Sequence, residues 1–351
     1  MAAPAKKIIP HQALHQLVTG LFTARGLRPD DARTVADVLV WANLRGVDSH
    51  GVSRVPRYME LFDKGESKPQ AQPSVQRLRS AVAVVDADSA PGPVALTAAM
   101  REAIEMAREA GVAWVAVRGT VHTGAIGYYT SLAAQAGMAG LGIVAGVPNM
   151  AYAGSRGAGV ATSPLSVALP ADRHPEVLLD MATAVIALGK IAQYKTSGQA
   201  LPEGAALDAD GAPTTDPATA KVPLPVGGAK GAGMSLVFEL LASGLTANPI
   251  VSAYHSGSPD GRRHRQNATL VAVDISAFVP VKDFVATVDE TLDAIKGLPA
   301  TDPARELLIP GERGARSYAQ RSAAGVPLGG KVWASLTEEA AKAGIPVPGL
   351  P

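Results

Sequence analysis

The segment Asp48–Arg54, with the sequence DSHGVSR, holds an acid, a hydroxyl group, an imidazole and a guanidinium within a few residues. The imidazole of His50 can give or take a proton near neutral pH. The guanidinium of Arg54 can hold a carboxylate by two parallel hydrogen bonds. This composition and spacing suit proton transfer on a substrate that carries a carboxylate. By itself, the same segment is also typical of a capped helix end with a surface ion pair.

Two further polar residues follow short apolar runs that are typical of buried strands. His122 comes after the run at 112–117, and Asp180 follows Val177-Leu178-Leu179. Ligands of open α/β sheets bind at the carboxyl ends of the strands. His122 is therefore a second acid/base candidate, and the Asp180 carboxylate could orient an imidazole. The alternatives are a loop histidine that is bonded to the backbone and a helix cap.

A glycine-rich stretch at 227–233, GGAKGAG, opens a predicted helix. Its backbone N–H groups, the helix dipole and Lys230 would together suit a pyrophosphate. It is not a Walker loop, because Gly231 follows Lys230 where that motif has Ser or Thr. No G-x-G-x-x-G motif follows the first strands, so an ordinary dinucleotide-binding fold is not predicted. A plain strand-to-helix turn remains the alternative for this stretch.

Composition excludes several classes of protein. The chain has 351 residues, 18% charged and 47% apolar, which indicates a globular protein of two or three domains. The net charge of +1, without a basic run interleaved with aromatic residues, argues against nucleic-acid binding. There is no cysteine, which excludes disulfides, cysteine–zinc sites and thiol nucleophiles. A serine hydrolase is not predicted either, because the G-x-S-x-G motif is missing.

Metal and membrane sites are not predicted. His50, His122 and Asp180 could form a two-histidine, one-carboxylate set, but no two of them have the helical spacing that would force them together. No apolar run reaches membrane-spanning length. The apolar run near the N-terminus is also too short for the core of a signal peptide. We therefore expect no membrane partner and a cytoplasmic location.

Hydrophobic periodicity predicts the elements that carry these residues. Helices are expected at 11–25, 29–45, 55–64, 92–110, 127–137, 183–197, 231–246, 283–297, 317–324 and 336–344. Strands are expected at 81–86, 112–117, 139–145, 166–169, 176–179 and 268–274. The strand–helix–strand order from 81 to 145 favours parallel pairing with right-handed crossovers. Residues 66–80 are expected to be irregular, and residues 247–266 to be polar and mobile.

Several separated motifs, in this order along residues 10–340, resemble the type-2 malate/L-lactate dehydrogenase family. They are DSHGVSR at 48–54, HTGAIGYY at 122–129, DMATAVIALGK at 180–190, LPEGAALDADGAPTTDP at 201–217, GGAKG at 227–231 and LIPGE at 308–312. Within the family, the motifs resemble those of ureidoglycolate dehydrogenase and 2,3-diketo-L-gulonate reductase. Jointly these motifs favour the functional interpretation of each segment over its structural alternative.

The resemblance implies a role for each candidate in the chemistry. It makes His50 the proton donor or acceptor, with Ser49 and Asp180 as its orienting partners. It makes Arg54 the group that binds the substrate carboxylate, and His122 a second acid/base candidate and substrate contact. An imidazole that Asp180 orients would have its pKa raised above the ordinary value of about 6.5.

The resemblance also implies a nicotinamide cofactor, NAD or NADP with NAD slightly favoured, and a homodimer. The cofactor contacts that it implies are Leu178, Leu179, Asp180, Met181, Ala182, Thr183, Ala229, Lys230, Gly311, Glu312 and Arg313. The fold it implies is an α/β, non-Rossmann fold of the family's own, with a largely parallel or mixed sheet and helical segments at both termini. We expect an N-terminal catalytic segment at 1–78, a cofactor-binding domain at 79–275, and a C-terminal segment at 276–351 that returns to the first.

Three departures from the family pattern make the substrate uncertain. Ser163 stands where the family usually has Asn, Ala229 where it has His, and Gly146-Val147-Pro148 where it has Thr-Asn-Ser. The expected reaction exchanges hydride between the cofactor and a 2-oxo acid/2-hydroxy acid pair, of the malate, lactate, ureidoglycolate or diketogulonate kind. One alternative is reduction of a cyclic imino acid, as in Δ1-piperideine-2-carboxylate reductases. A second alternative is a non-catalytic paralogue that only binds a small acid or the cofactor.

Overall fold

The computed structural model describes residues 6–302 and 304–347, which are built around a seven-stranded sheet. In spatial order its strands are β2 (Ser74–Arg79), β3 (Val82–Asp86), β4 (Val112–Thr120), β13 (Gln266–Asp274), β5 (Met138–Gly146), β8 (Leu165–Leu169) and β9 (Val177–Met181). Only β3 and β4 pair in parallel, and the other neighbours are antiparallel. The fold is therefore an α/β fold with a mixed sheet, as predicted.

Two expectations about this sheet are wrong. The parallel pairing predicted for the strands at 112–117 and 139–145 does not occur, because β13 lies between β4 and β5 and is antiparallel to both. Most of β13 is buried, so the centre of the sheet is the favourable position for it. Residues 74–79, expected to be irregular, form the edge strand β2. All six residues of β2 are exposed, so the strand lacks the alternation that would have predicted it.

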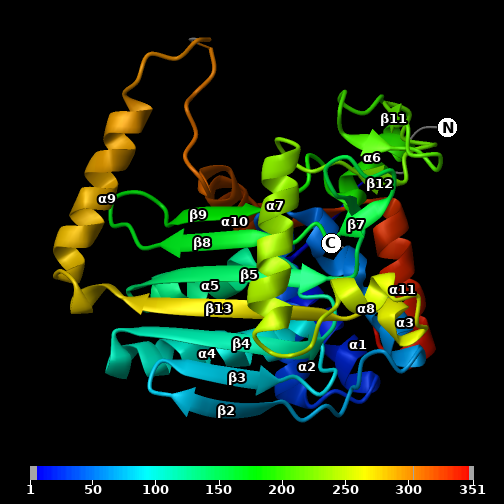
Figure 1. Ribbon diagram of the computed structural model, residues 1–351, viewed down its shortest axis with the longest axis horizontal. Helices are drawn as coiled ribbons and strands as arrows, with labels where there is room; N and C mark the ends of the chain where they lie inside the picture. Colours follow the sequence, from blue (N-terminus) through cyan, green and yellow to red (C-terminus); the bar gives the residue numbers. More distant parts are fainter. Residues whose placement is uncertain (1–5, 303, 348–351) are drawn as a thin grey trace.

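Helices cover both faces of the sheet (Figure 1). Helices α4 (Gly92–Ala110) and α5 (Gly127–Gln135) pack on one face, and α7 (Ala229–Glu239) crosses the other, followed by a π-helical turn at Leu240–Gly244. Each predicted helix has a counterpart. Helix α6 (Leu188–Ser197) begins later than predicted, because the chain before it is extended and the Val185 N–H donates to the Leu224 carbonyl oxygen. The segment 247–266, expected to be mobile, contains the short helix α8 (Val251–His255).

The two ends of the described chain meet. Strand β1 (Lys7–Ile9) pairs with β14 (Val326–Leu328), and α11 (Gly330–Ala343) contacts α1 (His11–Ala24). The other helices of this layer are α2 (Pro29–Leu44), α3 (Val55–Asp63) and α10 (Glu312–Ala324). One hydrophobic core contains residues of all three predicted segments, among them Val18, Ala95 and Ala340. The boundaries at 78 and 275 remain a prediction.

A small excursion leaves the main body after β9. The base of this excursion is closed where Ala184 pairs with Pro225. It contains α6 and a three-stranded sheet of β11 (Pro213–Thr214), β10 (Ala206–Leu207) and β12 (Val222–Pro223). Ile186, Ile191 and Leu201 belong to its separate small core. Another hairpin, β6 (Met150–Ala151) with β7 (Ala158–Val160), lies in the glycine-rich stretch 146–164.

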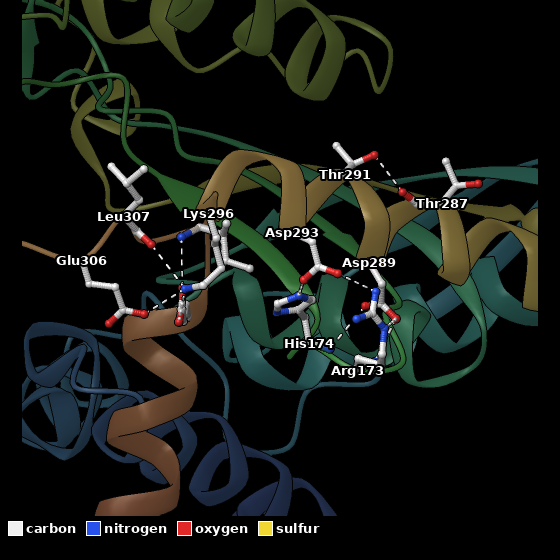
Figure 2. Close-up of polar contacts among 11 residues, drawn as sticks. Arg173, His174, Thr287, Asp289, Thr291, Asp293, Lys296, Glu306 and Leu307 are labelled. Carbon is white, nitrogen blue, oxygen red and sulfur yellow. Dashed lines mark hydrogen bonds and ion pairs between the residues drawn. The ribbon is translucent and has the colours of Figure 1, made fainter. Parts of the chain in front are cut away.

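Helix α9 (Val281–Lys296) lies at the end of the sheet where β13 finishes (Figure 1). Ion pairs hold it at two points, as Figure 2 shows. Asp293 contacts both Arg173 and His174 of the turn between β8 and β9. Lys296, in the same last turn of the helix, contacts Glu306 and Glu312. The start of α10 is thereby tied to α9.

Candidate active site

The segment 48–54 is held in a fixed shape by Asn43, a buried residue near the end of α2. The Asn43 amide donates to the Asp48 carboxylate at 2.7 Å, and its oxygen accepts from the Val52 N–H at 2.8 Å. Arg321 of α10 also contacts Asp48, at 2.7 Å. A Cβ on Gly51 would lie 2.1 Å from the Asn43 oxygen, so only glycine fits there. These contacts fix the direction in which His50 and Arg54 leave the backbone.

His50 is half-buried, and its ring nitrogens have different surroundings. Nδ1 lies 3.0 Å from the Ser49 Oγ, and Ser49 is one of the two residues predicted to orient this imidazole. Nε2 has no hydrogen-bond partner among the described residues, and it is not among their fully buried unpaired atoms. The His50 ring stacks on the ring of His122, with centroids 5.7 Å apart and an interplanar angle of 21°. The two candidate acid/base residues are therefore neighbours.

His122 is held by Tyr58, a fully buried residue of α3. The Tyr58 hydroxyl lies 3.0 Å from both the Nδ1 and the carbonyl oxygen of His122. Nδ1 is thus engaged, as it is in His50. Sequence analysis missed Tyr58 as a functional residue. The signal was its position four residues after Arg54 on a helix, where both side chains lie on one face.

Both imidazoles are neutral at neutral pH. Burial, and then the charge of Arg54, lowers the pKa of His50 to about 4. The same two causes lower the pKa of His122 well below its ordinary value. The expectation of a raised His50 pKa is wrong. No carboxylate contacts this imidazole in the described residues, while a guanidinium lies near it.

Asp180 does not contact His50, the imidazole that it was predicted to orient. Its carboxylate accepts a hydrogen bond from the Gly127 N–H at 2.9 Å, at the start of α5, and makes none to His50. Asp180 keeps exposed surface, yet the protein packed around its carboxyl group removes enough water to raise its pKa to about 6. The hydrogen bond from Gly127 and the charge of Arg45 oppose this increase.

Arg54 is anchored at one end of its guanidinium. Its Nε donates to the Ser49 carbonyl oxygen at 2.6 Å. The Nη atoms have no ion pair among the described residues, so they remain available for a carboxylate. Gly189, at the start of α6, lies next to both Ser49 and Arg54. The excursion that carries α6 therefore borders this side of the site.

The three segments predicted to contact a cofactor lie together along β9. The Leu178 N–H donates to the Pro310 carbonyl oxygen at 3.1 Å, which brings the segment 311–313 to one end of the strand. Beyond the other end, the Val226 N–H donates to the Thr183 carbonyl oxygen at 2.8 Å. This second contact brings the glycine-rich loop, with exposed Ala229 and Lys230, to Thr183. Segments far apart in the sequence thus form one continuous edge.

The side chains predicted to contact the cofactor differ in their exposure and in their hydrogen-bond partners. The Thr183 Oγ1 is buried without a hydrogen-bond partner among the described residues. The Glu312 carboxylate is occupied by Lys296, by Arg316 and by the Ile309 N–H. The Arg313 residue next to it is exposed. The remaining members are half-buried or buried on β9 or just beyond it: Leu178, Leu179, Met181 and Ala182.

A pocket of about 220 Å³ lies beside the histidines, at the end of β5. It is lined by the segments 144–149 and 161–164, with His264 and Gln266. The Gln266 side-chain oxygen accepts from the Thr123 N–H at 2.8 Å, which ties the pocket to the loop that carries His122. Burial, and then the charge of Arg57, lowers the pKa of His264 to about 4. Sequence analysis missed His264, because no motif surrounds it.

This arrangement joins two neutral imidazoles, a partly free guanidinium and a small pocket. A family model described as malate/L-lactate dehydrogenase matches residues 9–337. The chain belongs to the malate/L-lactate dehydrogenase family. That assignment confirms the resemblance seen in the separated motifs, and the family's members are oxidoreductases that act on hydroxy acids.

Relatives of known activity match nearly the whole chain. L-sulfolactate dehydrogenase of Methanocaldococcus jannaschii is 36% identical over 310 residues, which are 87% of this chain and 89% of that protein. The solved structure of that enzyme has a TM-score of 0.88, covering 97% of this chain and 98% of its own. The NAD-dependent ureidoglycolate dehydrogenase of Escherichia coli O157:H7 is 30% identical over 339 residues, 95% of each chain. The structure of Δ1-piperideine-2-carboxylate reductase from Pseudomonas syringae has 28% identity and a TM-score of 0.84, covering 95% of this chain and all of that one.

Two further findings concern the described residues. None of their helices combines the length and the apolar character needed to cross a membrane. Nowhere in 6–302 and 304–347 do three His, Asp or Glu side chains form a group that could hold a metal ion.

Proposed function

We propose that this protein exchanges hydride between a nicotinamide cofactor and a 2-oxo acid/2-hydroxy acid pair. The observation that carries the proposal is the stacked pair of His50 and His122 beside Arg54. Each ring has its Nδ1 engaged, by Ser49 and by Tyr58, and keeps its Nε2 without a protein partner. An anchored guanidinium next to two proton carriers suits a small acid whose carbonyl or hydroxyl group lies beside its carboxylate.

Arg54 binds the substrate carboxylate through its Nη atoms. Its Nε remains on the Ser49 carbonyl oxygen, so the guanidinium plane and the bound carboxylate keep one orientation. That orientation holds the adjacent carbon–oxygen group toward the imidazoles. The bound carboxylate also offsets the Arg54 charge that lowers the pKa of His50. Substrate binding therefore moves this pKa back toward the ordinary value.

The imidazole transfers the proton in either direction of reaction. In oxidation, a neutral imidazole accepts the hydroxyl proton at Nε2. This requires the other hydrogen to lie on Nδ1, which in His50 donates it to Ser49. In His122 the Nδ1 accepts from the Gly124 N–H, so the hydrogen of that neutral ring lies on Nε2. In reduction, the imidazole must first take a proton, and it then gives that proton to the carbonyl oxygen. We assign the transfer to His50, with His122 as the second candidate.

The residues along β9 fit a nicotinamide cofactor. A Cβ on Gly231 would lie 2.5 Å from the Thr183 carbonyl oxygen, so the start of α7 approaches β9 as only glycine permits. This leaves the Lys230 side chain and the Ala229 N–H for phosphate oxygens, because the next three N–H groups of α7 donate to carbonyl oxygens at 226–228. The unpaired Thr183 Oγ1 is a further contact. The pocket of about 220 Å³ beside the histidines has room for the nicotinamide ring. When bound, the cofactor supplies or accepts the hydride.

A screen of substrates tests the proposal. Purified protein receives 2-oxo acids and cyclic 2-imino acids with NADH or NADPH, and 2-hydroxy acids with the oxidised cofactors. We expect turnover of at least one 2-oxo acid, measured as the loss of dihydronicotinamide absorbance. Turnover of cyclic imines alone would favour the reductase alternative. Cofactor binding without turnover of any of these compounds would favour a non-catalytic paralogue.

A further inference from the structure

The loop 121–126 between β4 and α5 carries His122 and contains neither helix nor strand. Side chains from other elements therefore bind its backbone groups. Tyr58 and Tyr129 occupy two of the carbonyl oxygens. Their hydroxyl groups donate to His122 at 3.0 Å and to Thr123 at 2.5 Å. The same ring of His122 stacks on His50, so the position of this loop affects both imidazoles.

Two adjacent residues at the start of β13, the central strand of the sheet, bind N–H groups on either side of His122. The Gln266 Oε1 accepts from the Thr123 N–H at 2.8 Å. The Asn267 Oδ1 accepts from the Gly119 N–H, near the end of β4, at 2.9 Å. Neighbouring side chains on a strand point to opposite faces of the sheet, so these two bonds hold the chain from both faces.

The pairing of β4 with β13 is irregular at the same point. Two residues of β4 lie opposite Asn267 alone, because the register shifts between Gln266 and Ala268. A bulge of this kind leaves a backbone group without its strand partner and bends the chain. One of the two residues is Gly119, with a φ of 70°, which glycine adopts without strain. The Asn267 side chain takes the place of the missing partner, so it fixes the direction in which the chain leaves β4.

The Asn267 side chain is fully buried, and its other hydrogen bonds leave it one orientation. Its Nδ2 donates to the Asn248 carbonyl oxygen at 2.7 Å and to the Ser243 Oγ at 2.9 Å. Ser243 belongs to the π-helical turn after α7, and its hydroxyl donates to the Glu239 carboxylate at 2.9 Å. Because both N–H groups of the amide are occupied, its oxygen is the atom that faces Gly119.

Gln266 has different surroundings, since it is half-buried and lines the pocket of about 220 Å³ beside the histidines. It lies opposite Gly146 of β5. A Cβ on Gly146 would already lie 3.4 Å from both the Cγ and the Nε2 of Gln266. The bare backbone at Gly146 thus leaves room for the Gln266 side chain. Its bond to Thr123 joins the wall of the pocket to the residue directly after His122.

We propose that Gln266 and Asn267 are positioning residues that fix the direction of the His122 imidazole, and this rests on the proposed function. Both act through the backbone, Gln266 at Thr123 and Asn267 at the bulge of Gly119. A loosened loop lowers the fraction of molecules in which the imidazoles lie in the reactive arrangement. The loss therefore falls on kcat and leaves cofactor affinity unchanged.

Hydrogen–deuterium exchange of the full chain, without ligand, tests the contact of Gln266. Gln266→Met removes the acceptor and keeps a side chain of similar length, whereas Gln266→Glu keeps an acceptor oxygen. We expect the Thr123 amide to exchange about fivefold faster in Gln266→Met, the scale of one lost hydrogen bond, and to stay protected in Gln266→Glu. Unchanged exchange in Gln266→Met would overturn the role of Gln266. Equal loss of protection in both variants would also overturn it, because the acceptor oxygen would not be what holds the amide.

The contact of Asn267 has a matched control in the same buried network. Asn267→Leu removes the acceptor of the Gly119 N–H, whereas Ser243→Ala removes a neighbouring bond and leaves that acceptor in place. We expect the Gly119 amide to exchange about fivefold faster in Asn267→Leu only, although Ser243→Ala also lowers the melting temperature. Equally fast exchange in both variants would overturn the role of Asn267. If Asn267→Leu fails to fold, Gln266→Met decides the proposal.

Kinetics separate a positioning role from a structural one. Turnover is measured with the 2-oxo acid that reacts fastest in the screen, and binding of NADH and NADPH by fluorescence. We expect kcat to fall about tenfold in Gln266→Met while the dissociation constants of both cofactors stay within about twofold. Ser243→Ala should keep its kcat despite its lower melting temperature. A kcat that merely follows the melting temperature in all variants, or a weakened cofactor with unchanged kcat in Gln266→Met, would overturn the positioning role.

The proposed function and the positioning role fail in different ways. Turnover by the unaltered protein, with unchanged amide exchange in Gln266→Met and Asn267→Leu, would leave the proposed function standing and overturn the positioning role. Faster exchange in both variants, without turnover of any screened compound by the unaltered protein, would support the contacts to the loop and refute the proposed function.

Discussion

The imidazole rings of His50 and His122 lie almost parallel, 5.7 Å apart, although one follows α2 and the other follows β4. Ser49 and Tyr58 each engage the Nδ1 of one ring, so the Nε2 atoms are the ones left for a substrate. Arg54 fixes one orientation of the substrate, so only one of the two imidazoles can exchange a proton directly with the substrate oxygen. Variants can distinguish them.

The first prediction concerns the proton carrier. His50→Ala should lower the reduction rate at saturating substrate by a factor of roughly 10² or more, because general acid catalysis contributes about that much. Cofactor binding, measured by fluorescence, should stay near normal. His122→Ala is the matched comparison. If His122→Ala loses turnover and His50→Ala keeps it, the two roles are exchanged. If both variants keep it, no histidine acts as the acid.

The pH profile gives an independent test of the same residue. A lowered pKa leaves His50 unprotonated, and so ready as a base, at every pH above about 4. For oxidation, kcat/KM should therefore persist below neutral pH and fall only as the pH approaches that value. A fall centred near the ordinary histidine pKa of about 6.5 would contradict the lowered value.

The second prediction concerns Tyr58. Tyr58→Phe removes the hydroxyl that lies 3.0 Å from the Nδ1 and the carbonyl oxygen of His122, and it preserves the buried ring. We expect kcat to fall about tenfold or more, while KM changes little, because the imidazole loses its orientation and no substrate contact is lost. A matched loss of thermal stability with unchanged kcat would mean that Tyr58 serves only the packing of α3.

The third prediction concerns Arg54. Arg54→Lys keeps the positive charge but cannot hold the Ser49 carbonyl oxygen and present two further N–H groups together. KM for the acid should rise about tenfold or more, and cofactor binding should not change. Arg57→Lys is the control, because Arg57 already pairs with Glu60 on α3. Unchanged KM and kcat in Arg54→Lys would exclude a role in binding the carboxylate.

The fourth prediction concerns Asp180 and pH. The folded protein holds the proton of Asp180 up to about pH 6, above the ordinary value of 3.8, so folding favours the protonated form. Ionisation of this group therefore lowers stability as the pH rises from about 4 to 6, and the loss stays complete above that range. Asp180→Asn keeps an oxygen for the Gly127 N–H and removes the charge. Its melting temperature should exceed that of the unaltered protein at pH 8, and the two should converge near pH 4. A lower value at pH 8 would contradict the raised pKa.

The fifth prediction concerns assembly. The outer side of α7 and the following turn exposes apolar residues: Val237 by 49%, Leu240 by 58% and Leu245 by 61%. Such a surface favours an interface, and two-fold dimers are the commonest assemblies. We expect a homodimer by light scattering, and a monomer for Leu240→Glu. Val75→Glu, at the exposed edge strand, should stay dimeric. A monomeric unaltered protein at micromolar concentration would contradict the prediction.

The local parts of the site could be predicted from the amino-acid sequence. Hydrophobic periodicity predicted α1, α2, α4 and β9 closely, because side chains on one element report which face is buried. The contact between Ser49 and His50, and the position of Arg54 beside them, depend on neighbours along the chain. The motif at 48–54 was therefore enough to predict these local contacts. The separated motifs also identified the family before any contact between them was known.

The way in which distant segments combine depends on packing across the whole fold. Tyr58 meets His122 because α3 packs against the loop after β4, and nothing near either residue in the sequence indicates this contact. The pKa of His50 was predicted in the wrong direction, because Asp180 bonds to Gly127 while Arg54 and burial act on the imidazole. A pKa sums desolvation and charge over every element around a group, whereas a motif contains only the neighbours along one segment. The position of β13 in the middle of the sheet could not be predicted from its own segment either. β13 pairs with β4 and β5 because the position between them is buried, and that burial depends on the whole fold.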